Sequence, residues 1–269
     1  MTALTDQLSG KPSAGLTFPV AKPAADKVAE ISRANYRLRL ATSKADLRAA
    51  QVLRFVVFNL ELQEGLEQSY ATCLDADAYD EVCDHLLVED SRTNEVIGTY
   101  RLQTGLRAAS HLGYYSAQEF DFAPYEPFRH LMVELGRACV HSSHRNLIVL
   151  SLLWKGIANY ATRNGCRYLI GCSSLTSQDP ALGLAAYREM QRYLVREEWR
   201  TTPLPAFVCS TDVGATPVPK IPKLLTAYLA LGARICGPPA LDTEFKTIDF
   251  LTFLDLYAMP AKMVARYLS

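Results

Sequence analysis

The chain has 269 residues, enough for one large domain or two small ones, and 49% of them are hydrophobic, which allows a substantial core. Its 28 basic and 28 acidic residues cancel, so no overall charge points to nucleic acid or to an anionic membrane as the partner. Seven scattered cysteines without metal-ligand spacing indicate reduced thiols in a cytoplasmic protein.

The first third of the chain predicts an arm followed by a strand and a helix. Residues 1–34 are rich in small residues and proline and lack periodicity, so we expect an arm or partly ordered tail. Residues 36–41 alternate as a strand does, and a cap at Thr42 or Ser43 precedes apolar residues at helical spacing. Residues 63–81 are polar and acidic, which predicts a long loop or short helical turns.

The middle of the chain predicts the centre of a sheet. Residues 85–90 and 95–103 indicate two strands of a hairpin. The aromatic-rich stretch 104–130 is expected to form a lid or the wall of an apolar pocket. Residues 131–140 alternate and then run apolar, which predicts a buried strand, and apolar residues return at helical spacing from Ile148.

The remaining residues predict further alternation of strands and helices. The expected elements are a strand at 166–175, helices at 180–199 and 221–232, strands at 233–237 and 247–256, and a short helix at 260–268. Alternating strands and helices together with a hairpin favour one α/β domain with a mixed sheet over residues 35–269.

Charged residues recur inside elements that are otherwise apolar. On the central strand, Glu134 and Arg137 are costly to bury without partners, so they mark either a structural ion pair or a site. In an ideal strand they face opposite sides, so a direct pair between them requires a bulge. Similar charges are Arg54, Asp77, Asp80, Asp84 and Arg101. Each one alone is more simply a surface charge or a satisfied pair, but together they indicate a network lining one cleft.

Four segments in a fixed order carry a family resemblance. They are "LRFVVF" (53–58), "DADAYDEVCDHLLV" (75–88), "IGTYRLQ" (97–103) and "VELGRACVHSSHR" (133–145). Together they resemble the ornithine N-acyltransferases of bacterial ornithine-lipid synthesis, relatives of the acyl-homoserine-lactone synthases. The resemblance covers roughly residues 36–268 and implies a fold like that of the GNAT N-acetyltransferases, with a central mixed, mostly antiparallel sheet flanked by helices. The implied activity moves a long, often 3-hydroxylated fatty acyl group from acyl carrier protein to the α-amine of ornithine, giving lyso-ornithine lipid.

The resemblance also implies roles for single residues. The positions matching Arg54, Asp77, Asp80, Arg101, Glu134 and Arg137 form a charged cleft in the lactone synthases, with Glu134 as the implied base and Arg137 beside it. A positioned carboxylate base adds about 10²- to 10⁴-fold to a rate. Ornithine's ammonium groups suit Asp77, Asp80 and Asp84, and its carboxylate suits Arg54 or Arg101. A solvated acidic loop accounts equally well for the three aspartates.

The expected acyl donor is the acyl-phosphopantetheine of acyl carrier protein, with no separate cofactor. Acetyl-CoA enzymes of this fold hold the pyrophosphate with a Gly-rich loop, where this chain has "HSSHRNLIVL" (141–150). Cys172, Ser173 and Ser174 end the second buried strand, where the fold splays two strands to admit the thioester arm, which implies substrate binding by Ser173. Because Cys172 has no basic neighbour in the sequence, we expect direct transfer rather than an acyl-enzyme.

Carrier proteins are acidic, so the resemblance implies a basic docking face. The residues expected to form it are Arg145, Lys155, Arg188, Arg192 and Arg196, the last three spaced by four on one predicted helix. Such a face is more often simply solvated. The closing helix is mildly amphipathic, which fits either core packing or contact with the inner membrane surface. His141 and His144 lack a third ligand, so no metal site is predicted.

Two alternatives remain open. The acceptor can be another amino acid or precursor, such as glycine, tyrosine or a homoserine-lactone precursor, with the same chemistry. Alternatively, the chain is a non-catalytic module that binds an acyl carrier or lipid. A Glu134→Gln variant distinguishes them, because a binding module would keep its function and an enzyme would lose turnover.

Overall fold

The structure is a computed structural model, and it describes residues 30–209 and 216–267. Its strands are Ile31–Arg33 (β1), Tyr36–Leu40 (β2), Asp84–Asp90 (β3), Glu95–Thr104 (β4), Met132–Val140 (β5), Tyr168–Leu175 (β6), Arg234–Ile235 (β7), Ala240–Asp242 (β8) and Thr247–Asp255 (β9). Its α-helices are Lys44–Phe55 (α1), Ser69–Thr72 (α2), Gly105–Ser110 (α3), Leu147–Arg163 (α4), Pro180–Glu189 (α5), Lys223–Ala230 (α6) and Ala261–Tyr267 (α7).

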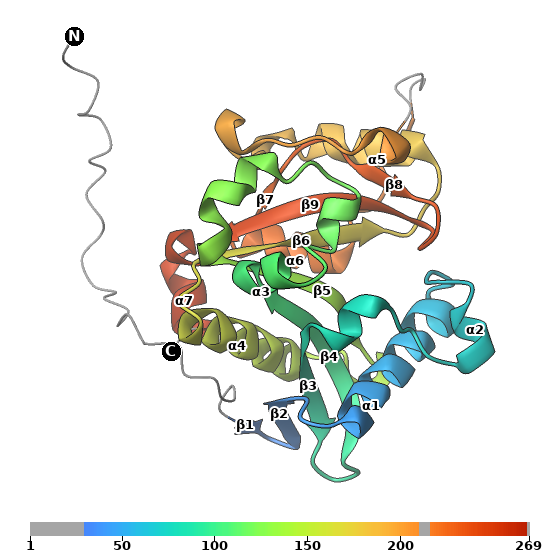
Figure 1. The fold of residues 1–269 in the computed structure, drawn as a ribbon, viewed down its shortest axis with the longest axis vertical. Coiled ribbons are helices and arrows are strands. Elements are labelled where there is room, and N and C mark those ends of the chain that lie inside the picture. Colours follow the sequence, from blue (N-terminus) through green and yellow to red (C-terminus); the bar gives the residue numbers. More distant parts are fainter. Residues whose placement is uncertain (1–29, 210–215, 268–269) are drawn as a thin grey trace, which may run out of the picture.

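The strands form one sheet that runs through the centre of the described residues (Figure 1). Its order is β1-β2-β3-β4-β5-β6-β9-β7, and β8 pairs with β9. Only β5 and β6 pair in parallel among these strands, and the other pairs are antiparallel. The expected mixed, mostly antiparallel sheet is confirmed.

Local sequence signals place the first elements. Ser43 caps α1 in a capping box: its hydroxyl accepts the Asp46 N–H at 3.1 Å, and the Asp46 carboxylate accepts the Ser43 N–H at 3.1 Å. Residues 31–33 lie in the predicted arm but pair with β2 as the edge strand β1. Residues 1–29 of that arm lie outside the described residues. The stretch 63–81 forms short helical turns, as predicted.

The aromatic stretch 104–130 packs on the sheet as a core layer. Tyr114, Phe120, Phe122 and Tyr125 are buried and pack in one cluster with residues of β5, β6 and β9. These side chains pack against one face of the sheet and do not form a lid. Only the segment around Tyr115 reaches the cavity described below.

The helix predicted over 180–199 was wrong in its second half. α5 ends at Glu189, and short turns follow. Leu194 forms an isolated parallel bridge with Ile235, and the Val195 N–H donates to the Ile235 carbonyl at 3.0 Å. This extended pairing with β7 takes the backbone groups that a continuing helix would need.

Helices cover both faces of the sheet. Figure 1 shows α4 and α1 on opposite sides of β3 and β4, and α4 carries the larger core cluster with Leu152 and Ile157 fully buried. Met263 and Val264 of α7 pack against that cluster, so the apolar side of the closing helix faces the core. Among the described residues, every helix is too short or too polar to span a bilayer.

The sheet opens between its two parallel strands. β5 and β6 pair only at Met132 with Tyr168, Val133 with Leu169 and Glu134 with Ile170. Beyond this point β5 continues along β4 and β6 continues along β9, so the two strands diverge. We call this point the fork. Gly171 lies at it, and a Cβ at this position would lie 2.1 Å from the Leu135 carbonyl oxygen.

We expect Gly171→Ala to push the two strands apart at the fork. Overpacking of this kind costs about 1–3 kcal/mol, which lowers the melting temperature by about 2–4 °C for each kcal/mol in a chain of this size. Thermal unfolding checks the effect. Gly136→Ala is the matched control, because a Cβ there meets no atom within 4 Å. Equal melting temperatures for the two variants would contradict the close approach.

Candidate active site

A cavity of about 770 Å³ occupies the fork and extends to both faces of the sheet. Toward α4 and α6 its lining is apolar, with Leu102, Leu135, Leu153, Trp154, Ala227 and Leu254. On the other side the lining is charged or polar, with Glu64, Arg101, Glu134, Arg137, Asp242 and Asp249. Because side chains alternate along strands, the cavity joins an apolar end on one face to a charged end on the other.

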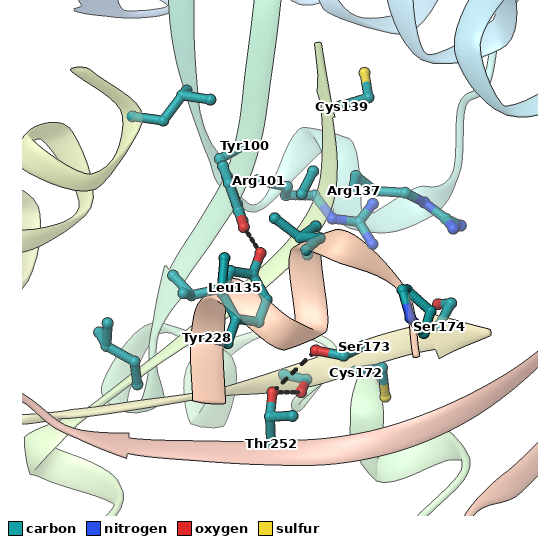
Figure 2. A pocket seen from close by; sticks show the side chains of 18 of the residues that line it. Tyr100, Arg101, Leu135, Arg137, Cys139, Cys172, Ser173, Ser174, Tyr228 and Thr252 are labelled. Atoms are coloured by element: carbon teal, nitrogen blue, oxygen red, sulfur yellow. Dashed lines mark hydrogen bonds between the residues drawn. The ribbon is translucent and has the colours of Figure 1, made fainter. Parts of the chain in front are cut away.

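Figure 2 shows side chains that line the cavity. Tyr228 of α6 reaches toward Tyr100 of β4, and their hydroxyl groups bond to each other at the apolar end. Ser173, a predicted substrate-binding residue, lies on the cavity wall, and its hydroxyl bonds the Thr252 hydroxyl at 3.3 Å. The wall at the fork is therefore held by strand side chains that bond one another.

Glu134 lies at the last paired position before the fork. The residue is 4% exposed, and its carboxylate accepts the Tyr115 N–H at 2.8 Å, the Ser116 N–H at 2.8 Å and the Gln103 Nε2–H at 2.6 Å. Three donors from two segments fix the carboxylate in one orientation at the cavity wall.

Arg137 does not pair with Glu134. The register between β4 and β5 shifts here, and Arg137 has a φ of +50°, so this residue forms a β-bulge. The bulge brings its side chain to the face that carries Glu134, but its guanidinium bonds Asp77 at 3.1 Å and Tyr115 Oη at 3.4 Å. A backbone conformation this rare for arginine persists only where the surroundings fix it.

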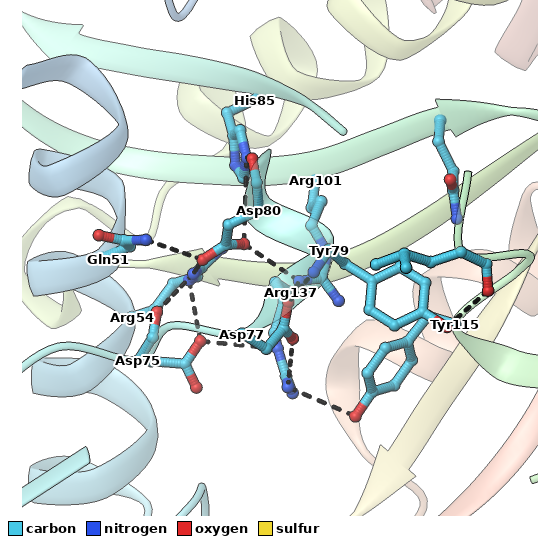
Figure 3. Close-up of polar contacts among 12 residues, drawn as sticks. Gln51, Arg54, Asp75, Asp77, Tyr79, Asp80, His85, Arg101, Tyr115 and Arg137 are labelled. Atoms are coloured by element: carbon cyan, nitrogen blue, oxygen red, sulfur yellow. Dashed lines mark hydrogen bonds and ion pairs between the residues drawn. The ribbon is translucent and has the colours of Figure 1, made fainter. Parts of the chain in front are cut away.

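Three arginines and three aspartates form a buried network beside the cavity (Figure 3). Asp80 bonds both Arg54 and Arg101, at 2.5 Å and 3.0 Å. Asp77 joins Arg101 to Arg137, at 2.5 Å and 3.1 Å, and Asp75 closes the set with Arg54 at 2.9 Å. Equal numbers of opposite charges let this group be buried, and the network ties the loop before β3 to the sheet.

The network also sets the ionisation of its members. Burial opposes the charged form of Asp80, but Arg54 and Arg101 beside it hold the pKa of that carboxyl below its usual value. Asp77 behaves in the same way, since Arg101 and Arg137 outweigh burial and lower its pKa. These aspartates are therefore anions, and the neighbouring arginines already neutralise their charges.

Several of these residues make contacts other than those predicted for them. Arg101 and Arg137 line the cavity, whereas Arg54, Asp77 and Asp80 do not. Asp84 stays outside the network and bonds Arg107 at 2.9 Å and Tyr160 Oη at 2.7 Å. The aspartates predicted to bind an ammonium thus bind other side chains, and the Arg54 guanidinium, which is fully buried, faces carboxylates of this chain.

A second group of buried acids was not predicted. Glu64, Asp242 and Asp249 line the charged end of the cavity, and Glu119 lies beside Asp249. Burial first, and then the charges of Asp249 and Asp242, raise the pKa of Glu119 well above its usual range. Burial raises the pKa of Asp249 to about 6, with Asp242 adding to the effect. Asp249 was detectable in the sequence, because it interrupts the apolar run "TIDFLTFLD".

Cys172 lies among these acids. The facing side-chain atoms of Glu119, Cys172 and Asp249 lie within 4.8 Å of one another, close enough to share one cation. Burial, followed by the charges of Glu119 and Asp249, raises the pKa of the Cys172 thiol well above its usual value. A thiolate nucleophile is thereby disfavoured, which agrees with the expected direct transfer.

The start of α4 is closed by a side chain. Asn146 Oδ1 accepts the N–H groups of Ile148 at 2.9 Å and Val149 at 3.1 Å. These are amides that a Gly-rich loop enzyme would offer to a pyrophosphate. His141 caps the preceding turn, where its Nδ1 accepts the Ser143 N–H.

The mouth of the cavity combines exposed leucines with cations. Leu62, Leu147 and Leu224 are exposed and line the cavity, together with Arg145 and Lys223. Arg145 is also bound to Glu61, at 2.5 Å and 2.8 Å. This rim therefore presents both apolar and positively charged side chains to solvent.

The predicted docking face is divided. Arg188 lies on α5, Arg192 lies on the following turn, and Arg196 precedes another turn, so the three do not share a helix face. All three are exposed. Arg145 lies in the turn before α4 and Lys155 in the middle of α4, which covers the other half of the sheet.

Comparison with known proteins agrees with this architecture. The family model "Acetyltransferase (GNAT) domain" matches residues 53–155. The solved structure of FeeM, an N-acyl amino acid synthase from uncultured soil microbes, superposes with a TM-score of 0.51 at 11% identity, covering 83% of this chain and 91% of that one. At this identity the likeness concerns the fold alone.

Two curated relatives match nearly the whole chain. The L-ornithine Nα-acyltransferase of Brucella abortus (strain 2308) is 33% identical over 257 residues, covering 86% of this chain and 88% of the relative. The protein of the same name from Rhizobium meliloti (strain 1021) is 33% identical over 269 residues, covering 93% and 88%. Matches of this extent, on a fold with a forked sheet and a charged cavity, show that the chain belongs to the L-ornithine Nα-acyltransferase family.

Proposed function

We propose that this protein transfers a long-chain fatty acyl group, 3-hydroxylated in the preferred donor, from acyl carrier protein to the α-amine of ornithine, giving lyso-ornithine lipid. The observation that carries the proposal is the cavity through the fork, which joins an apolar end to a charged end. An acyl chain fits the first and an amino acid fits the second. The names of the two curated relatives support ornithine as the acceptor.

In the proposed reaction the α-amine attacks the thioester carbonyl, so a C–N bond forms and the C–S bond breaks. Glu134, fixed at the fork by three hydrogen bonds, takes a proton from the amine. Arg137 and Arg101, which line the cavity, bind the acceptor carboxylate. Backbone N–H groups of β5 beyond the fork stabilise the oxyanion. The proton taken up by Glu134 passes to the departing pantetheine sulfur, so the thiol is released and the Glu134 carboxylate is restored.

Two features support acyl carrier protein as the donor. Asn146 occupies the first amides of α4, which are then not free to bind a pyrophosphate. A phosphopantetheine arm carries a single phosphate at the position where acyl-CoA carries a pyrophosphate. The mouth offers Arg145 and Lys223 beside exposed leucines, which suits an acidic carrier and its apolar cargo. In this proposal the carrier docks at the mouth and along α4, and the arginines of α5 and the turns after it are not part of the docking face.

Because acyl carrier protein is a cytoplasmic protein, the proposed reaction takes place in the cytoplasm. Its product is amphiphilic, so release at the inner membrane surface is favourable. Because α7 turns Met263 and Val264 to the core, the leucines of the mouth are the proposed membrane contact.

Mass spectrometry of a reaction containing purified protein, acyl carrier protein loaded with 3-hydroxyacyl groups, and isotopically labelled amino acids tests the proposal. A labelled acyl-ornithine is expected. A labelled acyl-glycine or acyl-tyrosine would keep the chemistry and overturn the acceptor. No acylated amine from folded protein would overturn the enzymatic role in favour of a binding module.

Narrowing the apolar end is expected to shorten the accepted acyl chain. Ala227 of α6 lines the cavity, so Ala227→Phe fills space that the chain end would occupy. We expect the product distribution, measured by mass spectrometry with mixed acyl donors, to shift toward shorter chains. Ala230→Phe is the matched control, since Ala230 is exposed on the same helix. An unchanged distribution in Ala227→Phe would place the acyl chain elsewhere.

A further inference from the structure

The charged end of the cavity holds four buried carboxyl groups that no cation among the described residues pairs with directly. Glu64, Glu119, Asp242 and Asp249 are each at most 7% exposed. Asp242 is held by N–H groups of its own turn, and Glu64 by the Thr176 hydroxyl. In the part of the chain that the structure describes, none of the four has a Lys, Arg or His nitrogen within ion-pair distance, and Arg137 is the cation whose charge acts on Glu119.

Two buried acceptor atoms on the cavity lining lack a hydrogen-bond donor. Asp249 Oδ1 is one, in a residue that is 5% exposed. Gln103 Oε1 is the other, in a residue that is 2% exposed and whose Nε2 bonds Glu134. Orphan acceptors cost free energy when buried, so each marks a place where a donor from outside the chain would be stabilised. One lies beside Glu134, and the other lies in the acid cluster.

Both places line the same cavity. Cys172 lies within 4.8 Å of the Glu119 and Asp249 carboxylates, and the charge of Glu134 also acts on its thiol. The cavity thus offers an acceptor site at the fork and a more acidic one next to it. An amino acid with a second ammonium group matches this pair, whereas glycine or tyrosine would leave the acids without a cation.

We propose that Asp249, with Glu119 and Asp242, forms a subsite for the side-chain ammonium of a diamino-acid acceptor. This inference rests on the proposed function. An alkylammonium group with a pKa of about 10.4 stays charged near neutral pH, so it donates up to three hydrogen bonds to the carboxylates. Held there, the side-chain amine is protonated and turned away from the thioester, which leaves the α-amine as the nucleophile. The subsite therefore sets both the choice of acceptor and the position of acylation.

The test compares ornithine with norvaline, which has the same carbon chain and lacks the side-chain amine. Steady-state rates are measured with acyl carrier protein as donor for the wild type, Asp249→Asn and Asp255→Asn. Asp255 is the control because it lies on the same strand and bonds Arg167 outside the cavity. Asp249→Asn is expected to fold, because burial raises the pKa of Asp249 and its charge opposes folding in the empty site.

We expect Asp249→Asn to raise KM for ornithine by about 10- to 100-fold, as for loss of one charge-assisted hydrogen bond. Its kcat/KM for norvaline should stay near the wild-type value, so the preference for ornithine shrinks, whereas Asp255→Asn keeps it. An unchanged preference in folded Asp249→Asn overturns the subsite. Equal losses with both amino acids also overturn it, because they would show a role in chemistry.

Three further outcomes are decisive. If EDTA removes activity on ornithine and a divalent cation restores it, the acids bind a metal and the ammonium subsite is overturned. If the wild type acylates neither amino acid, the proposed function itself fails. If the wild type acylates norvaline and ornithine with equal kcat/KM, the proposed chemistry stands and only the subsite is overturned.

Discussion

Replacing Glu134 with glutamine is expected to lower kcat by about 10²- to 10⁴-fold, the contribution of a positioned general base. The amide cannot accept the proton of the attacking amine, and its NH₂ group would face one of the N–H donors of Tyr115 and Ser116. Turnover with saturating acyl carrier protein and ornithine measures the loss, and circular dichroism establishes that the variant is folded.

A pH profile separates a base from a residue that only positions the loop. If Glu134 is the base, the acidic limb of the kcat profile should disappear in Glu134→Gln. Gln103→Leu is the companion variant, because it removes one donor to Glu134 and keeps the carboxylate. Wild-type turnover in Glu134→Gln would contradict the proposed mechanism and return the fork to a binding role.

Breaking the buried network is expected to have the largest effect on stability. Asp80→Asn removes the charge that faces Arg54 and Arg101 while keeping the side-chain shape. Removing one partner of a buried ion pair costs about 3–5 kcal/mol. Urea denaturation measures the free energy of unfolding. The control is Glu126→Gln, whose pair with Arg129 is exposed and should contribute no more than about 1 kcal/mol.

The stability difference should depend on pH with a defined sign. The arginines hold the pKa of folded Asp80 below its ordinary value of 3.8. The wild type therefore has this stabilisation in full above pH 3.8 and loses it as the pH falls toward the folded pKa. Asp80→Asn has no such group, so the two unfolding free energies should converge in acid. A difference that stays constant to low pH would show that packing, and not charge, explains the loss.

Local patterns predicted the elements whose signals lie within a few residues. Ser43 with Asp46 specifies the start of α1, and the alternation around Glu134 specifies β5. The second half of the predicted helix at 180–199 failed because its backbone pairs with Ile235, about forty residues later in the chain. The periodicity of a short segment contains no information about such a partner.

The site shows the same limit. The charges of Glu134, Arg137, Arg101 and Asp80 were found because each is costly to bury on an apolar element. The hydrogen-bond partners of these side chains were not predictable, because each lies at least eighteen residues away in the chain or depends on the bulge at Arg137. Glu119 stands in an irregular segment where a carboxylate is ordinary, so no pattern marked it as buried.

The two halves of the sheet are joined at β5 and β6 by a short contact. Three residue pairs form this contact, and β6 continues for five residues past it, roughly 17 Å at 3.3 Å per residue. A tilt of one half-sheet against the other by a few degrees therefore changes the width of the gap most at its tip and least at Glu134. Because Glu134 is itself paired with Ile170 at this contact, such a tilt would leave its position almost unchanged.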